Sequence, residues 1–261
     1  MGILNVTPDS FYDGGRHAGA AAAIAHAIRL AEEGADILDI GGESTRPGAA
    51  PVSPDAEFAR VAPVLEALRD CGKPLSIDTR RAEVMRQALA LGADMINDVS
   101  GFGTDESIAA LAGHAAAVCV MHMKGEPSTM QNAPVYRDVV SEVRQFLYGR
   151  IRKLTDAGVA RDRIVLDPGI GFGKTQPQNV ELIRQLRRIA GLRQPVLVGV
   201  SRKSLIGHLT GRTADDRLAG SIAGALAAVS RGAMIVRVHD VAQTRDALRV
   251  WQALCEGPPD A

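Results

Sequence analysis

Cysteine is scarce in this chain of 261 residues. Its three cysteines, Cys71, Cys119 and Cys255, stand far apart, and their number is odd. They give neither a disulfide framework nor the spacing of metal ligands. A chain without disulfides suits a reducing compartment, so we expect the protein in the cytoplasm.

The sequence also lacks an excess of either charge. It carries 30 basic and 30 acidic residues, for a formal net charge of +0. No basic surplus is present to attract nucleic acid or an anionic membrane. No signal-peptide pattern occurs, and no apolar run approaches the roughly 18 residues that a membrane span needs. We therefore predict a soluble protein with no nucleic-acid or membrane partner.

Several catalytic motifs are missing as well. There is no Gly-x-Ser-x-Gly elbow and no early GxGxxG turn, and the six histidines lack HExxH spacing. The segment DPGIGFGKT (residues 167–175) resembles a phosphate loop, but Pro168 stands where GxxxxGK[ST] needs glycine. Acyl transfer by a nucleophile, a P-loop and a zinc site are therefore not indicated.

A repeated unit is present instead: a helix, a glycine that ends it, and then a short apolar strand. The expected strands are residues 3–6, 37–40, 74–78, 93–99, 115–122, 163–167, 195–200 and 233–238. The expected helices are residues 18–33, 53–71, 81–91, 105–112, 136–157, 177–190, 215–231 and 241–254. The glycines expected to precede strands are Gly34, Gly72, Gly92, Gly113, Gly158, Gly191 and Gly232.

Alternating strands and helices favour parallel strands with right-handed crossovers. Eight such units in 261 residues predict an α/β fold, a single (β/α)8 TIM barrel with eight parallel strands. A doubly wound sheet is the alternative, and the missing GxGxxG turn argues against its dinucleotide-binding form. No linker or low-complexity segment interrupts the chain, so residues 1–261 are predicted to form one domain.

Polar residues stand at the predicted carboxyl ends of the strands, where a barrel carries its active site. They are Asn5, Asp39, Asp78, Asn97, Asp98, His122, Asp167, Ser201, Arg202, Lys203, Arg237 and His239. Any one of them could simply cap the following helix, and His122 could fill the core. Convergence on one mouth favours a binding site. Carboxylates and amides suit a flat heterocycle with N–H donors, whereas the cations suit a phosphate or diphosphate.

At these strand ends the sequence strongly resembles the bacterial dihydropteroate synthase family. The motifs that carry the resemblance are LNVTPDSF (4–11), DGG (13–15), GGESTRPGA (41–49), SIDT (76–79), IND (96–98), MHM (121–123), DPGIGFGK (167–174), SRKS (201–204) and RVHDV (237–241). They run in order to about residue 250, one for each strand end.

The resemblance implies a barrel enzyme of folate synthesis. It would join p-aminobenzoate to 6-hydroxymethyl-7,8-dihydropterin diphosphate and release diphosphate. The implied pterin contacts are Asp78, Asn97, Asp167 and Lys203, and the residues lining that pocket are Met121, Phe172, Gly199 and Arg237. The implied catalytic residues are Asp78, Lys203, Arg237 and His239.

The resemblance also implies Mg2+, with Asn5 as its ligand near the diphosphate, whose oxygens Arg237 and His239 hold. The implied p-aminobenzoate site, built partly by two mobile loops, is framed by Phe11, Thr45, Arg46, Pro47 and Ser204. Inhibition by sulfonamides is expected, as is a homodimer formed through helices late in the chain.

Two departures stand out: a short segment that normally precedes the first strand is expected to be missing, and Tyr12 replaces a small polar residue. Two rival functions are a pterin-binding methyltransferase domain and a non-catalytic paralogue. The first would have little use for STRPG and SRKS, and the second would be expected to lose Lys203 or Arg237. All of these are intact.

Overall fold

The computed structural model describes residues 1–7, 15–44, 52–126, 129–130 and 134–255. Within these ranges, short strands alternate with helices, as predicted. The strands are β1 (Gly2–Asn5), β2 (Leu38–Gly41), β3 (Leu75–Asp78), β4 (Met95–Asp98), β5 (Ala117–Met121), β6 (Ile164–Asp167), β7 (Leu197–Val198) and β8 (Ile235–Val236).

The strands close into a ring. Strands β1 to β6 form one parallel sheet in chain order, and β7 pairs in parallel with β8. Two isolated parallel bridges join these sheets, Leu166 with Val196 and Gly2 with Val238. The N–H of Ile3 donates to the carbonyl of Val238 at 3.0 Å. The predicted eight-stranded barrel is therefore confirmed.

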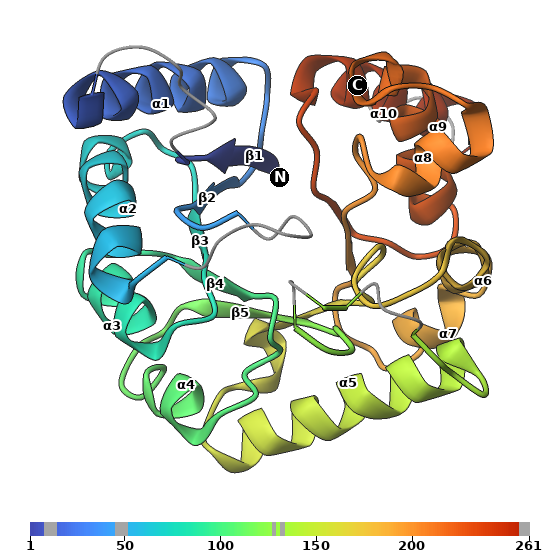
Figure 1. Ribbon diagram of the computed structural model, residues 1–261, viewed down its shortest axis with the longest axis horizontal. Helices are drawn as coiled ribbons and strands as arrows, with labels where there is room; N and C mark the ends of the chain where they lie inside the picture. Colours follow the sequence, from blue (N-terminus) through green and yellow to red (C-terminus); the bar gives the residue numbers. More distant parts are fainter. Residues whose placement is uncertain (8–14, 45–51, 127–128, 131–133, 256–261) are drawn as a thin grey trace.

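The helices lie in a ring outside the strands (Figure 1). They are α1 (Gly15–Glu32), α2 (Pro54–Leu68), α3 (Ala82–Ala90), α4 (Asp105–Ala109), α5 (Val139–Asp156), α6 (Gln176–Arg184), α7 (Arg187–Ala190), α8 (Ser204–Thr210), α9 (Leu218–Val229) and α10 (Val241–Cys255). Four of these helices, α2, α4, α5 and α6, begin after a residue whose side chain caps them. Ser53, for example, accepts the N–H of Ala56 ahead of α2, and Asp138 accepts the N–H groups of Val140 and Ser141 ahead of α5.

Three details of the predicted elements are wrong. The expected helix 177–190 is broken into α6 and α7, and α8 was not expected at all. Gly191 does end α7, as expected, with φ −61°, and the positive φ in that connection falls on Arg193, at 60°. The regular parts of β7 and β8 are two residues each, shorter than the expected strands.

Two apolar clusters fill the fold on opposite sides of the strands. The larger one packs strand residues such as Leu4 and Ile40 against helix residues such as Leu30 and Leu65. The smaller one consists of Met1, Met95, Cys119, Val165 and Leu197. Its strand members alternate with residues of the larger cluster, so they point into the barrel. The lower part of the barrel is thus plugged with apolar side chains.

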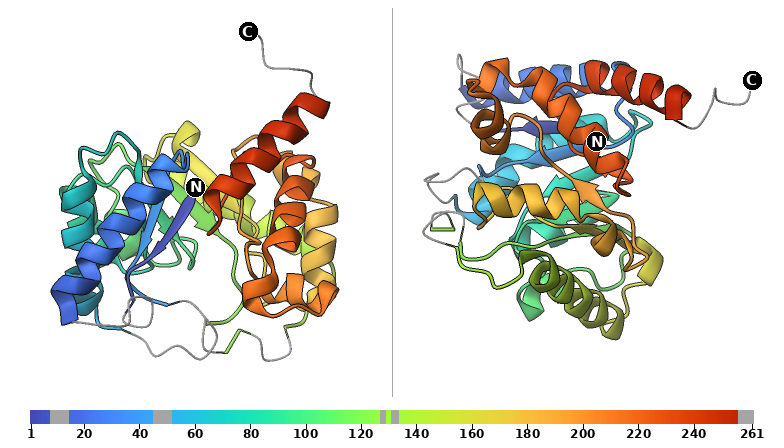
Figure 2. Two further views of the ribbon diagram at one scale, coloured as in Figure 1. Left: turned by 90° about the horizontal axis from the view of Figure 1, so that it is seen from above. Right: turned by 90° about the vertical axis from the view of Figure 1, so that its right-hand side faces the viewer.

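Helix α10 completes the ring beside α9 and then projects beyond the other elements towards the C-terminus (Figure 2). Its Arg245 donates to the carbonyl of Gly34, at the end of the α1 connection, at 2.5 Å. Among the described helices, none combines the length and apolar character that a membrane crossing requires.

Candidate active site

The candidate site lies inside the barrel, above the apolar plug. Side chains two residues further along each strand point the same way. The plug residues Met95, Cys119, Val165 and Leu197 each have a residue two positions further along the chain that faces the barrel interior. These residues are Asn97, Met121, Asp167 and Gly199. In the strand register, Asn5, Gly41, Asp78 and Asn97 lie side by side across β1 to β4. The structure thus brings the predicted residues of these strands to one mouth.

Asp39 is the hub of one side of this mouth. It is fully buried on β2. One carboxylate oxygen accepts the hydroxyl of Ser76 at 2.6 Å. The other accepts Arg237 Nε at 2.5 Å and Asn97 Nδ2 at 3.2 Å. The sequence marked Asp39 as a strand-end carboxylate but gave it no role; here it orients two of the predicted site residues.

Arg237 bridges two carboxylates. Its Nε is bound by Asp39, and its Nη2 donates to Asp78 at 2.8 Å. Burial raises the pKa of Asp78 to about 7, although Arg237 opposes the change and Asp39 reinforces it. Asp78 is therefore close to half-ionised at neutral pH, so charges beside it can shift its protonation state.

The other side of the mouth is built around Asp167 and Lys203. Asp167, at the end of β6, accepts the N–H of Gly169 at 2.7 Å, and burial raises its pKa. Lys203 Nζ donates to the carbonyl of Ile170 at 2.5 Å and lies 4.7 Å from the centre of the Phe172 ring. Burial lowers the pKa of Lys203 to about 8, and Asp167 opposes this shift.

Gly199 separates the two cations. A Cβ placed on Gly199 would lie 3.7 Å from Arg237 Cβ and 3.8 Å from Lys203 Nζ. A larger side chain would therefore fill the space between the two halves of the mouth. Met121, buried at the end of β5, pairs in register with Asp167 and closes the floor beside it. A flat ring between these halves would meet carboxylates, an amide, a cation and the Phe172 face.

The end of β8 carries His239, which contacts the end of β7. His239 Nδ1 lies 3.0 Å from the hydroxyl of Ser201. Arg202, which the sequence grouped with the cations of the mouth, instead forms a two-pronged ion pair with Asp240. Ser204, the first residue of α8, is exposed and accepts Gln176 Nε2 at 3.3 Å.

Most of the predicted p-aminobenzoate site falls on residues that the structure does not describe. Phe11, Thr45, Arg46 and Pro47 of the predicted p-aminobenzoate site lie outside the described residues, as does Tyr12.

Two strand-end residues have structural roles instead. Asp98 accepts the N–H groups of Ser100 and Phe102, so it caps its own loop. His122 packs edge-on against Phe146, with ring centres 4.9 Å apart, and burial lowers its pKa to about 3. His122 is therefore a neutral core residue, one of the two alternatives that the sequence left open.

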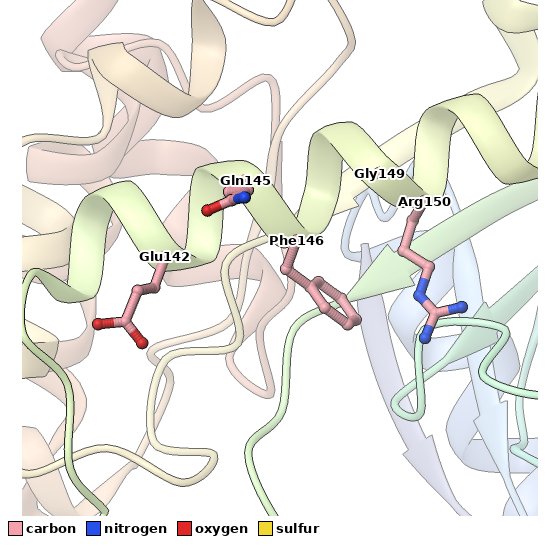
Figure 3. A pocket seen from close by; sticks show the side chains of 5 residues that line it. All are labelled: Glu142, Gln145, Phe146, Gly149 and Arg150. Atoms are coloured by element: carbon pink, nitrogen blue, oxygen red, sulfur yellow. The ribbon is translucent and has the colours of Figure 1, made fainter.

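A separate hollow of about 480 Å³ lies along α5 (Figure 3). It is lined by Glu142, Gln145, Phe146, Gly149 and Arg150. Arg150 lies over the Phe146 ring at 5.0 Å and donates to the carbonyl of Phe102 at 3.2 Å. Of the predicted site residues that the structure describes, none lines this hollow, so it is distinct from the mouth.

The described residues contain no group of three His, Cys, Asp or Glu side chains placed to hold a metal ion. Asn5 offers a single amide oxygen at the end of β1, 3.9 Å from where a Cβ on Gly41 would stand. Mg2+ commonly uses one or two protein oxygens together with waters and substrate phosphates. Asn5 therefore fits an Mg2+ ion bound mainly through a diphosphate, and does not fit a metal held by protein alone.

Comparison with known proteins gives consistent matches. The family described as pterin binding enzyme matches residues 1–239. The dihydropteroate synthase of Neisseria meningitidis serogroup C is 54% identical over 259 residues, which cover 97% of this chain and 92% of that protein.

Solved structures agree in fold and sequence. Dihydropteroate synthase of Xanthomonas albilineans with 4-aminobenzoic acid superimposes with a TM-score of 0.93 and 52% identity, covering 99% of this chain and 93% of the other. The same enzyme in complex with 7,8-dihydropteroate gives 0.90 and 50%, covering 99% and 94%. Dihydropteroate synthase of Yersinia pestis with a sulfonamide drug complex gives 0.93 and 43%, covering 98% and 94%.

Proposed function

The chain belongs to the dihydropteroate synthase family, and we infer from this membership that it joins 6-hydroxymethyl-7,8-dihydropterin diphosphate to p-aminobenzoate. The products are 7,8-dihydropteroate and diphosphate, and the reaction belongs to folate biosynthesis. The 54% identity to a dihydropteroate synthase over nearly the whole chain carries this conclusion. Related enzymes with bound 4-aminobenzoic acid, 7,8-dihydropteroate and a sulfonamide support the same small-molecule ligands here.

For the residues of the site, we propose that the pterin ring lies between the two halves of the mouth. Asp78 and Asp167 would accept its N–H groups, Asn97 would contact its edge, and Lys203 would donate to its carbonyl. Met121, Gly199 and Phe172 would shape the pocket. The support is geometric: these side chains come from strands β3 to β7 and the loops that follow them, and they point into one space.

The diphosphate would lie at the outer end of this pocket. We propose that His239 and Arg237 contact its oxygens. Since Nε and one N–H of Nη2 already bind Asp39 and Asp78, the contact falls to the remaining N–H groups of Nη1 and Nη2. Asn5 would hold Mg2+ that arrives with the substrate. When bound, that ion would neutralise charge on the leaving diphosphate.

We propose a dissociative substitution. The bond between the pterin methylene and the diphosphate oxygen breaks first, and its electron pair leaves with the diphosphate. The positive charge then left on the methylene and pterin is favoured by the carboxylate of Asp78, while the cations hold the leaving group. The amine of p-aminobenzoate bonds to the methylene carbon and then loses a proton to solvent. This amine is neutral at pH 7, so no strong base is required.

The p-aminobenzoate site is proposed next to Ser204, with Phe11, Thr45, Arg46 and Pro47 assigned from the family resemblance. Sulfonamides would compete for the same site. For the protein's location we propose the cytoplasm, supported by the free thiols of Cys71, Cys119 and Cys255.

We also propose a homodimer formed through the last helices. Val250 and Leu254 are four residues apart on α10, so they share one face. They are 60% and 81% exposed. Leu254→Glu should shift sedimentation towards a monomer, whereas Tyr148→Glu on α5 serves as a matched control that should not.

The function is tested by measuring diphosphate release with and without p-aminobenzoate. Release should be fast only when p-aminobenzoate is present, and dihydropteroate should appear in equal amount. Transfer of a methyl group, or release that ignores p-aminobenzoate, would contradict the proposed reaction.

A further inference from the structure

Lys174 is a buried cation to which the proposed reaction gives no role. It belongs to the segment that resembles a phosphate loop, yet its side chain is only 1% exposed. Burial lowers its pKa to about 7, with Asp167 opposing the change. A buried ammonium is costly unless its hydrogen bonds are satisfied, so its partners indicate what it does.

The partners of Lys174 are three backbone carbonyls from two different loops. Its Nζ donates to His122 at 3.1 Å, to Gly169 at 2.9 Å and to Phe172 at 2.8 Å. An ammonium group has three N–H donors, and here each has an acceptor. The first carbonyl follows β5 and the other two belong to the loop after β6. Lys174 therefore ties these two loops together at one point.

Around Lys174 the two loops approach each other closely at two glycines. Gly169 has φ +68°, and a Cβ there would lie 1.9 Å from the carbonyl oxygen of His122. Gly173 has φ +60°, and a Cβ there would lie 2.3 Å from the carbonyl oxygen of Lys124. The loop of residues 168–173 is thus folded tightly against the β5 loop, with its carbonyls turned towards the ammonium.

This loop carries three contacts of the proposed pterin pocket. The N–H of Gly169 donates to Asp167 at 2.7 Å, and the carbonyl of Ile170 accepts Lys203 Nζ at 2.5 Å. The ring of Phe172 lies 4.7 Å from the same ammonium of Lys203. A shift of the loop would therefore move the carboxylate, the cation and the aromatic face on one side of the mouth, and leave Asp78, Asn97 and Arg237 in place.

We propose that Lys174 is a positioning residue for pterin binding: its ammonium fixes the loop of residues 168–173, which in turn fixes Asp167, Phe172 and Lys203. The inference rests on the proposed function, because it assumes that the pterin occupies this side of the mouth. A purely structural lysine would contribute to stability and leave the KM for the pterin diphosphate unchanged relative to the KM for p-aminobenzoate.

The test uses two variants and one control in the full-length enzyme. Lys174→Met keeps the length of the side chain and removes all three donors, whereas Lys174→Gln keeps two donors. Lys153→Met is the control, since Lys153 is an exposed lysine of α5 that pairs with Asp105 at 2.8 Å, away from the mouth. For each protein, KM is measured for 6-hydroxymethyl-7,8-dihydropterin diphosphate and for p-aminobenzoate, along with the thermal midpoint.

Lys174→Met should raise the KM for the pterin diphosphate by about tenfold or more, because charge-assisted bonds that fix the loop are lost. Lys174→Gln should raise it less. The KM for p-aminobenzoate, measured at saturating pterin diphosphate, should stay near the wild-type value in both, and the control should match wild type.

Equal rises in both KM values would overturn the proposal, as would an unchanged pterin KM with only a lower midpoint. Failure of both Lys174 variants to fold would also overturn it, since the lysine would then serve the fold as a whole. The wild-type enzyme separates this inference from the function itself. If wild type forms dihydropteroate and the variants show no selective loss, only the role of Lys174 fails.

Discussion

Asp39→Asn is the most informative substitution that the site suggests, because Asp39 touches no solvent and yet holds two site residues. The change preserves shape and removes the charge. The new amide can keep one oxygen towards Arg237 Nε and Asn97 Nδ2 and turn its NH2 towards Ser76, whose hydroxyl can accept as well as donate. The principal loss is therefore the charge on the bond to Arg237.

That loss can be estimated. A hydrogen bond to a charged group contributes about 1.5–3 kcal/mol, and a neutral one about 1 kcal/mol, so the difference is about 0.5–2 kcal/mol. Asp78 would then be the one carboxylate of this pair that still holds Arg237 by charge, so the guanidinium would become less well oriented. We expect pterin diphosphate to bind roughly two- to thirtyfold more weakly, since about 1.4 kcal/mol corresponds to a factor of ten. Calorimetric titration of the purified variant measures this directly, with exposed Asp246→Asn on α10 as the matched control.

The same variant has a pH signature. In the wild-type enzyme, burial and the charge of Asp39 raise the pKa of Asp78 to about 7, so kcat/KM for the pterin substrate should fall as the pH drops below about 7 and Asp78 is protonated. Without the negative charge of Asp39, the pKa of Asp78 falls, and the decline should begin at lower pH. A decline at the wild-type pH or higher, or unchanged pterin affinity, would refute the assignment of Asp39 as the hub.

Three further substitutions test other parts of the site. In the wild type, pterin affinity should fall above about pH 8, because the lowered pKa of Lys203 lets it lose its proton. Lys203→Met should weaken pterin binding and abolish this alkaline loss of affinity. An alkaline loss that survives in the variant would point to another group. Gly169→Ala, whose Cβ would lie 1.9 Å from the carbonyl oxygen of His122, should lower the free energy of unfolding by about 2 kcal/mol or more in urea denaturation, and a wild-type midpoint would contradict the geometry. Asn5→Ala should raise the Mg2+ concentration for half-maximal activity by about tenfold, and an unchanged metal titration would remove Asn5 as the ligand.

The barrel was predictable because its signals are local. Helix-ending glycines and short apolar strands recur along the chain, and Gly34, Gly72, Gly92, Gly113, Gly158 and Gly232 all have the positive φ that such positions require. Helix α8 was missed because it is only seven residues long and begins at Ser204, inside the polar SRKS segment. Its end at Gly211, with φ +72°, was the one signal that could have revealed it.

The site was predictable in its residues but not in its connections. Strand-end position placed Asp78, Asn97, Asp167 and Lys203 among the residues of the mouth, and the family resemblance singled them out as pterin contacts. The bond from Arg237 to Asp39 joins residues 198 positions apart, and only closure of the barrel brings them together. Lys174 was compared with the lysine of a phosphate loop, and the sequence alone could not show that three carbonyls surround it. Such roles depend on register and burial, which residue type and spacing do not specify.

Pterin should bind in the barrel mouth between the Asp78 and Asp167 sides, and a crystal structure of this enzyme with 7,8-dihydropteroate would show whether it does. The pterin N–H groups should lie within hydrogen-bond distance of the carboxylates of Asp78 and Asp167, with Lys203 at the ring carbonyl and the p-aminobenzoyl group leading out past Ser204. A pterin ring found elsewhere, such as in the hollow along α5, or one that contacts neither carboxylate, would contradict the account.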